Sequence, residues 1–161
     1  MMQDNTIDGS EEVVRVVSSE WVVDGELQQS AFMLNPRETY LSVNRPIIDS
    51  YEADVRSFVL SHDKFLFDNG NSYRIASISV SDIRAISVYN EDNQELNINV
   101  EVEPRDTHMK SHAGIFVRSG EINIIPNRQL SEFPKTVSTD MVLQEVRWGL
   151  LDIAQLEKCN L

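Results

Sequence analysis

The sequence has few of the residues on which common catalytic and metal-binding motifs depend. It contains one cysteine, Cys159, and six glycines among 161 residues. One cysteine cannot form a disulfide within these residues or supply a zinc site of paired cysteines, and a reducing compartment is expected. The glycines are too scattered for a phosphate-binding loop, and the G-x-S-x-G turn of α/β-hydrolases is absent. The sequence therefore predicts no cofactor and favours a protein without enzymatic activity.

Positive charge and long apolar runs are also scarce. The chain has 14 lysines and arginines against 26 acidic residues, which gives a formal net charge of −12. Such a chain is repelled by phosphate backbones and anionic membranes, so neither nucleic acid nor membrane is expected as a partner. No apolar run approaches the roughly 20 residues that span a bilayer, and the polar start lacks the features of a signal peptide. We therefore expect a cytoplasmic protein of bacterial type, in which acidity serves solubility or complements a basic partner.

Length and composition are those of one compact domain. A chain of 161 residues with 41% hydrophobic residues can bury roughly 70% of its unfolded surface without disulfides or metals. Residues 1–11 are polar and acidic and show no periodic apolar pattern. We therefore expect a disordered tail over residues 1–11 and a single domain over residues 12–161.

The middle of the chain alternates apolar and polar residues with the period of two that is typical of β-strands. The clearest run, residues 96–103, places four apolar side chains on one face. Asn69-Gly70 between two alternating segments predicts a tight hairpin, because both residues tolerate positive φ. The alternating segments lie at residues 12–17, 40–43, 65–67, 73–80, 86–88, 96–103, 115–117 and 122–125.

Two segments have the helical period of 3.6 residues instead. Residues 50–61 follow a potential cap at Ser50, and residues 139–157 follow one at Ser138 or Thr139. The apolar stripe of the second helix consists of Val142, Leu143, Val146, Leu150, Ile153 and Ala154. The sequence thus predicts an α+β domain, an antiparallel β-meander of five or six strands with at least two helices packed on it.

Asp106, His108 and His112 are the residues closest to a metal-binding pattern. Histidines four residues apart share one face of a helix and can bind zinc or iron together with a carboxylate. Here they follow Pro104 in a predicted loop, where this spacing fixes no geometry. We therefore expect no metal site, with His108 in solvent and His112 hydrogen-bonded at the start of a strand.

A second group of candidate residues surrounds the strand at residues 40–43. Arg37 and Arg45 flank it, and guanidinium groups beside hydroxyl and amide groups can bind an anion. Along a strand, Leu41, Val43 and Arg45 share one face, whereas Ser42 lies on the other. The alternative is a surface strand with solvated arginines.

Trp148 stands out on the second predicted helix. It falls within the polar arc, near Met141, instead of on the apolar stripe. Such a tryptophan is either covered by residues 126–137 or offered to a partner. In the second case Met141 and Trp148 belong to a protein interface, and a homodimer is its simplest form.

Four short motifs resemble those of a family of small bacterial proteins. They are W-x-x-x-G at residues 21–25, S-A-F at 30–32, L-S-V at 41–43 and H-A-x-I at 112–115. The resemblance implies no activity, but it implies that Phe32, Ser42 and His112 lie close together. The chain departs from the family pattern in the Gly-Ile-Phe that follows His112-Ala113 and in its long acidic strand.

Three functions are compatible with the sequence. Missing catalytic motifs, negative charge and Trp148 favour a cytoplasmic binding or accessory module that contacts another protein, either one with a basic face or a second copy. The alternative is a small enzyme or anionic-ligand-binding domain in which Ser42, Arg45 and His112 form a pocket and neutral His112 acts as a base. An acidic antitoxin or immunity protein is the third, and charge alone supports it.

Overall fold

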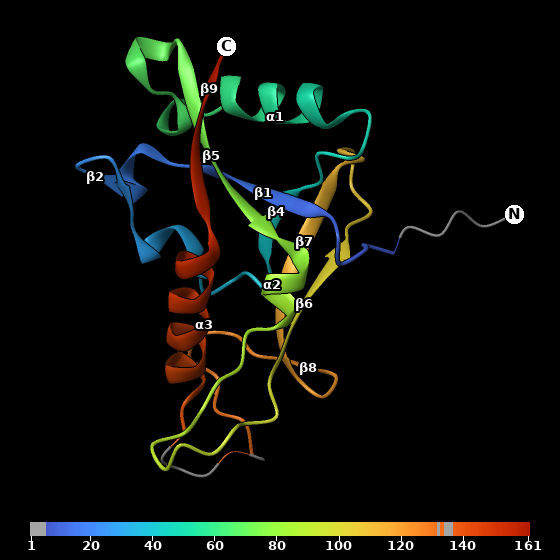
Figure 1. The fold of residues 1–161 in the computed structure, drawn as a ribbon, viewed down its shortest axis with the longest axis vertical. Coiled ribbons are helices and arrows are strands. Elements are labelled where there is room, and N and C mark those ends of the chain that lie inside the picture. Colours follow the sequence, from blue (N-terminus) through green and yellow to red (C-terminus); the bar gives the residue numbers. More distant parts are fainter. Residues whose placement is uncertain (1–5, 132, 134–136) are drawn as a thin grey trace, which may run out of the picture.

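The structure, a computed structural model, describes residues 6–131, 133 and 137–161. Its described residues form a seven-stranded antiparallel sheet with helices packed against it, which confirms the predicted α+β fold (Figure 1). The sheet has one strand more than the upper end of the predicted range. A separate hairpin of β2 (Val22–Val23) and β3 (Glu26–Leu27) turns through Asp24 and Gly25, both with positive φ.

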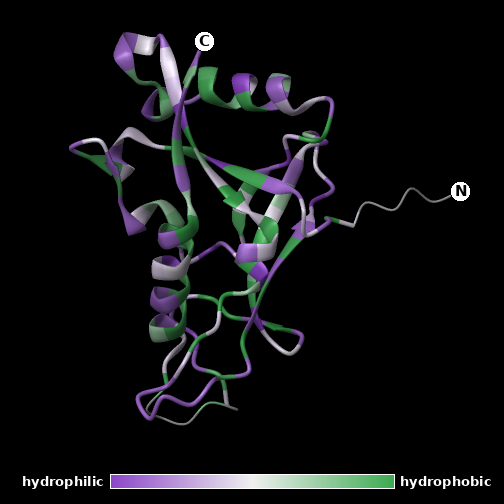
Figure 2. Cartoon of the chain, in the orientation of Figure 1, coloured by the Kyte–Doolittle hydropathy of each residue, from purple (hydrophilic) through white to green (hydrophobic). Residues whose placement is uncertain are grey.

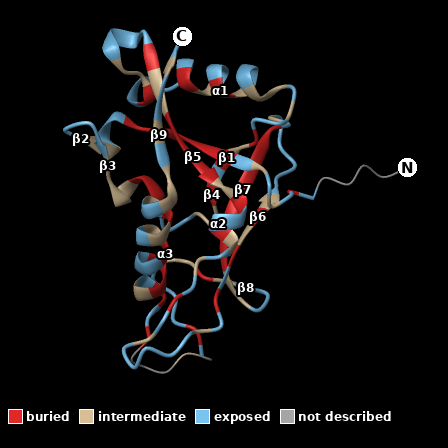
Figure 3. Ribbon diagram, viewed as in Figure 1, coloured by how far each residue is buried: buried red, intermediate tan, exposed pale blue. Residues whose placement is uncertain are grey.

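The strands of the main sheet are ordered so that the N-terminal strand lies near its centre. The order is β6 (Asn99–Pro104), β7 (His112–Ser119), β4 (Leu41–Asn44), β1 (Glu12–Val17), β5 (Ser72–Ser79) and β9 (Gln155–Asn160), with β8 (Ile122–Asn123) also paired to β7. Buried residues concentrate on the inner strands of this order, while β9 at the edge is largely exposed (Figure 3).

The sheet opens between its two central strands. β1 and β5 pair along the whole of β1, from Glu12 opposite Ser79 to Val17 opposite Arg74. In contrast, β1 and β4 share the single register pair of Val14 with Asn44. The sheet is therefore two antiparallel halves that meet at one point and diverge beyond it.

Helices cover the apolar face of the sheet and enclose the main core. α3 (Thr139–Ile153) packs with α2 (Val80–Arg84) and with the 3-10 helix η2 (Gln29–Phe32). Hydrophobic segments face inward between these helices and the strands, and polar segments face outward (Figure 2). The Oγ of Ser138 accepts a hydrogen bond from the backbone N–H of Met141 and caps α3, as the sequence predicts.

A smaller apolar cluster lies at the other end of the molecule. α1 (Tyr51–Leu60) places Val55 and Val59 against Val16 and Phe65, the last of which lies in the 3-10 helix η3 (Asp63–Phe65). α1 therefore covers β1 on the side where the central strands diverge.

Several predicted elements differ in the structure. The expected strand at 86–88 is wrong: these residues have no regular structure and follow α2, which forms because Val80 and Ile83 are buried together at helical spacing. The helix expected over 139–157 ends at Ile153, and the chain continues as β9, because β5 offers an open edge for backbone pairing. The strand expected from residue 96 begins at Asn99.

The N-terminal segment is held to the fold from Ile7 onward. Ile7 is 1% exposed in the main core, and Arg84 on α2 donates a hydrogen bond to its carbonyl over 2.8 Å. The ordered domain therefore begins before residue 12, the predicted boundary, while residues 1–5 lie outside the described part. None of the helices in that part has the length and apolar character to cross a membrane.

Candidate functional site

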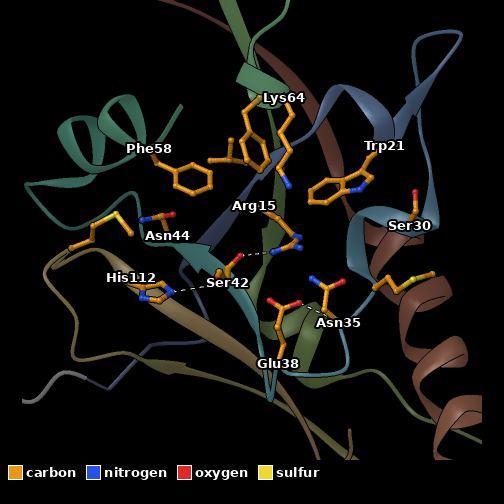
Figure 4. Close-up of a pocket in the computed structure, with 14 residues that line it drawn as sticks. Arg15, Trp21, Ser30, Asn35, Glu38, Ser42, Asn44, Phe58, Lys64 and His112 are labelled. Atoms are coloured by element: carbon orange, nitrogen blue, oxygen red, sulfur yellow. Dashed lines mark hydrogen bonds between the residues drawn. The ribbon is translucent and has the colours of Figure 1, made fainter. Parts of the chain in front are cut away.

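A cavity of about 380 Å³ opens where β1 and β4 diverge (Figure 4). Its apolar wall consists of Val16, Trp21, Met33, Phe58, Phe65 and Met109. Its polar wall consists of Ser30, Asn35, Ser42, Asn44 and His112, and the charged residues Arg15, Glu38 and Lys64 complete it. The size and mixed lining are those of a small-molecule site.

Arg15 occupies the gap between the diverging strands. Its Nη1 donates a hydrogen bond to the carbonyl of Ser42 over 2.8 Å, and its Nε donates to the carbonyl of Ala31. Its guanidinium also lies 5.1 Å from the ring centroid of Trp21, a cation–π contact. Arg15 therefore replaces part of the β1–β4 ladder and holds η2, β4 and Trp21 around the cavity.

The second nitrogen of the fork, Nη2 of Arg15, is available to the cavity. It donates to no group among the described residues, whereas every fully buried side-chain nitrogen or oxygen there has a hydrogen-bond partner. Nη2 is therefore not fully buried, and Arg15 lines the cavity although the residue is only 9% exposed.

The charge of Arg15 lacks an ion-pair partner within the described residues. Burial lowers the pKa of Arg15 to about 10, and the charge of Glu38 acts in the opposite direction. Glu38 forms no ion pair with it, and its Oε1 accepts from the backbone N–H of Asn35. Arg15 is thus a buried cation at neutral pH whose free hydrogen-bond donors face a cavity.

His112 and Ser42 meet on the opposite wall. Register pairs Asn44 with His112 and Ser42 with Gly114, which places Ser42 and His112 on the same face of neighbouring strands. The Nε2 of His112 lies 3.2 Å from the Oγ of Ser42 (Figure 4). The Nδ1 of His112 lies 3.1 Å from the Oγ1 of Thr107.

His112 is neutral at pH 7. Burial lowers its pKa below the ordinary value of 6.5, and electrostatic interactions with Arg105 and His108 lower it further. His112 is 8% exposed, and its ring packs beside that of Tyr40, tilted by 52° at a centroid distance of 5.9 Å. A neutral imidazole beside a hydroxyl can act as a base.

Tyr40 fits beside His112 because residue 114 is glycine. The rings of His112 and Phe116 flank Gly114 on this face of β7, and Tyr40 contacts both rings. A Cβ at position 114 would lie 2.6 Å from Cδ2 of Tyr40. Glycine is therefore required here for close approach of the Tyr40 ring.

A polar network ties α1 to this wall of the cavity. Asn44 Nδ2 donates to the Oγ of Ser111, which donates to Asp54 over 2.6 Å. Burial raises the pKa of Asp54, but its hydrogen bonds from Ser111 and Ser50 together lower it, and the pKa falls below its usual value. The carboxylate of Asp54 thus orients Ser111 and, through it, Asn44.

The structure brings together two of the three residues in the predicted pocket. Ser42 and His112 share the cavity, but Arg45 lies elsewhere and forms an ion pair with Glu11. The physical reason is strand alternation, which places Arg45 on the opposite face from Ser42. Arg37 is exposed and does not line the cavity. The predicted pocket is therefore corrected: Arg15 supplies its cation.

The other candidate residues lie away from this cavity. His108 is exposed, and no cluster of three metal-ligating side chains exists within the described residues. Trp148 on α3 is 47% exposed. The segment expected to cover it, residues 126–137, lies partly outside the described residues. Met141 packs partly against the main core.

Arg15 is a site residue that the sequence patterns did not single out. The sequence feature that could have identified Arg15 is its position as the single charged residue in the otherwise apolar run of residues 13–17. A buried strand tolerates a charge only where other groups hold it, so such a residue marks a binding or structural contact. No known protein family, no curated protein and no solved structure matches this chain.

Proposed function

We propose that the protein binds a small carboxylate with an apolar or aromatic body in the cavity between β1 and β4. The observation that carries this proposal is Arg15, a buried cation that lines the cavity. It has no ion-pair partner among the described residues, and its Nη2 donates to none of them. A carboxylate there completes the hydrogen bonds of the guanidinium fork and neutralises its charge.

The remaining walls support an apolar body for the ligand. Trp21, Phe58 and Phe65 present rings to the cavity, and Met33 and Met109 add flexible apolar surface. Lys64 brings a second cation, against the single carboxylate of Glu38. The lining is therefore net positive in a protein whose formal charge is −12, which favours an anion at this position.

The fluorescence of Trp21 provides a direct test. The chain has two tryptophans, so a Trp148→Phe variant leaves Trp21 as the only reporter. Hexanoate and phenylacetate are titrated against their neutral amides, hexanamide and phenylacetamide. We expect saturable fluorescence changes with the carboxylates and binding at least about tenfold weaker for the amides.

Two variants locate the anion. Arg15→Met is expected to weaken carboxylate binding about tenfold or more, whereas Arg37→Met, which removes an exposed arginine, leaves it unchanged. Arg15→Lys keeps the positive charge but lacks the paired N–H donors of the guanidinium group, and it shows whether a loss of affinity comes from misfolding. Circular dichroism monitors the fold of each variant. Equal binding of carboxylates and amides by the parent protein would overturn the proposal.

A second candidate function is protein binding at Trp148. The exposed indole is surrounded by Asp82, Glu145 and Asp152, which line the same depression. This acidic rim supports a basic protein partner, the function that the sequence favours, and an antitoxin or immunity protein is a special case of it. We propose the cytoplasm as its location and a bacterium as its source on the sequence features alone.

A further inference from the structure

The contacts of Thr107 are the basis on which we assign the proton of neutral His112 to Nδ1. Thr107 Oγ1 donates its only hydrogen to the carbonyl of Met109 over 3.2 Å and accepts from the backbone N–H of Met109 over 3.3 Å. Its second lone pair therefore accepts from Nδ1 of His112, 3.1 Å away. Since neutral imidazole carries one N–H, its Nε2 is left as an acceptor.

That acceptor faces Ser42. With the proton on Nδ1, the 3.2 Å contact between Nε2 and Ser42 Oγ is a hydrogen bond donated by the serine hydroxyl. Ser42 is exposed to the cavity, whereas His112 is buried behind it. The order Thr107–His112–Ser42 is the arrangement in which an oriented base activates a nucleophile.

We propose that Ser42 is a nucleophile and that the cavity hydrolyses small esters that carry a free carboxylate. This rests on the proposed function, because the carboxylate occupies the anion position at Arg15. Arg15 Nη1 contacts the carbonyl of Ser42 itself, so anchor and nucleophile are neighbours. A carboxylate held there places an ester group a short chain away beside Ser42.

Each step of the reaction has a group that performs it. Ser42 Oγ attacks the ester carbonyl carbon while its proton passes to His112 Nε2. The bond to the leaving oxygen then breaks, and that oxygen takes the proton from Nε2 and departs as the alcohol. Water attacks the acyl group on Ser42, gives one proton to Nε2 and releases the acid as Ser42 recovers its hydrogen.

Asn44 is the hydrogen-bond donor that stabilises the negative charge on the carbonyl oxygen when Ser42 attacks the ester. It lies two residues from Ser42 on the same face of β4 and lines the cavity. One hydrogen of its Nδ2 goes to Ser111, and the second is available. Ser111 and Asp54 hold the amide in place, so this donor is oriented before substrate binds.

Mono-4-nitrophenyl glutarate, which carries a free carboxylate, and 4-nitrophenyl butyrate, which does not, are the probes. We expect the protein to hydrolyse the glutarate ester at least about 100-fold faster than buffer and to prefer it to the butyrate. Ser42→Ala abolishes this rate, whereas Ser57→Ala, which removes an exposed serine on α1, does not. We expect phenylmethylsulfonyl fluoride to modify Ser42, and peptide mass spectrometry identifies the modified residue.

The pH profile separates a positioning role of Thr107 from a structural one. Protonated His112 cannot accept the serine proton, so the rate rises with pH and reaches half its plateau below pH 6.5, the ordinary pKa of histidine. Arg105 and His108 act on this pKa. The Tyr40 ring, just before β4, and Asp54 on α1 lie nearby. Thr107→Val lowers the plateau and shifts the midpoint, because the tautomer is no longer fixed.

The outcomes distinguish the two proposals. Hexanoate binding without ester hydrolysis or modification of Ser42 overturns the catalytic proposal and leaves the binding proposal standing. Absence of both binding and hydrolysis overturns both. Ser42→Ala is expected to retain hexanoate binding, and hydrolysis by this variant at the parental rate would place the nucleophile elsewhere.

Discussion

Arg15 and Arg45 are both buried arginines, but their surroundings differ. Arg45 forms a two-point ion pair with Glu11, in which both nitrogen–oxygen distances are 2.9 Å and both side chains are nearly inaccessible. Arg15 instead donates to two backbone carbonyls and contacts the ring of Trp21. The charge of Arg45 therefore serves to attach the N-terminal segment, whereas that of Arg15 is available to a ligand.

Glu11→Ala tests the structural role of the first pair. Removal of the carboxylate deletes two hydrogen bonds and the ion pair of a buried guanidinium, so the free energy of unfolding should fall by about 3 kcal/mol. Urea unfolding followed by circular dichroism measures this loss. Glu20→Ala, at an exposed position, should change stability by less than about 0.5 kcal/mol. Equal unfolding midpoints for both variants would show that the Glu11–Arg45 pair contributes little.

For single residues, the sequence predicted the face of the strand on which a side chain lies better than the residues that it contacts. Strand alternation correctly placed Ser42 on the face opposite Leu41 and Val43. The contact between Ser42 and His112 joins residues 70 positions apart, and the four-motif resemblance was its only sequence signal. No local pattern reveals that Thr107 orients His112, because this depends on how the loop before β7 closes.

Gly114 shows how one element depends on its neighbour. A β-strand interior normally disfavours glycine, and the structure explains its presence by the ring of Tyr40, which covers it. Tyr40 in turn contacts His112, Phe116 and the guanidinium of Arg105. The position therefore links β4 and β7 beside the candidate site.

Gly114→Ala should destabilise the protein by about 1–3 kcal/mol, because the new methyl group displaces Tyr40. Thermal unfolding measures the loss, and a Tyr40→Val replacement in the Gly114→Ala background should recover part of it by making space. Gly9→Ala is a suitable comparison, since its nearest contact would be an ordinary 3.8 Å. No loss from Gly114→Ala, or no recovery in the double variant, would refute the close approach described here.

The elements themselves were predictable where local pattern and tertiary contacts agree. The strand at residues 12–17 and the helix at 50–61 match β1 and α1 to within one residue. The prediction failed at α2 and β9, which are short and whose form depends on non-local contacts: α2 packs against β6 and α3, and β9 pairs with β5. Period alone cannot separate such segments from a strand or from a longer helix.

The charge of the whole molecule is distributed unevenly. The lining of the cavity is net positive, whereas the depression beside Trp148 has the three carboxylates of Asp82, Glu145 and Asp152. From composition alone, the acidity indicated either a basic partner or a role in solubility, but not where on the surface the acidic residues gather. The fold places these three carboxylates on the surface of α2 and α3, where they support the proposed basic partner.

The same acidic rim argues against a homodimer through Trp148. In a two-fold dimer the carboxylates of both copies would face each other and repel, whereas a lysine-rich or arginine-rich partner would neutralise them and stack a cation on the indole. We therefore expect a monomer by sedimentation at low salt.

A lysine-rich amphipathic peptide serves as the probe of this face. Its binding should shift the fluorescence of Trp148 and weaken as salt rises, because the contact between the acidic rim and lysine is electrostatic. Trp148→Ala should weaken binding, measured by calorimetry, about tenfold or more, since a central aromatic residue dominates such interfaces. Ile47→Ala, which removes another exposed apolar side chain, should not. Equal affinity of both variants, or a salt-independent dimer lost in Trp148→Ala, would show that the basic-partner assignment is wrong.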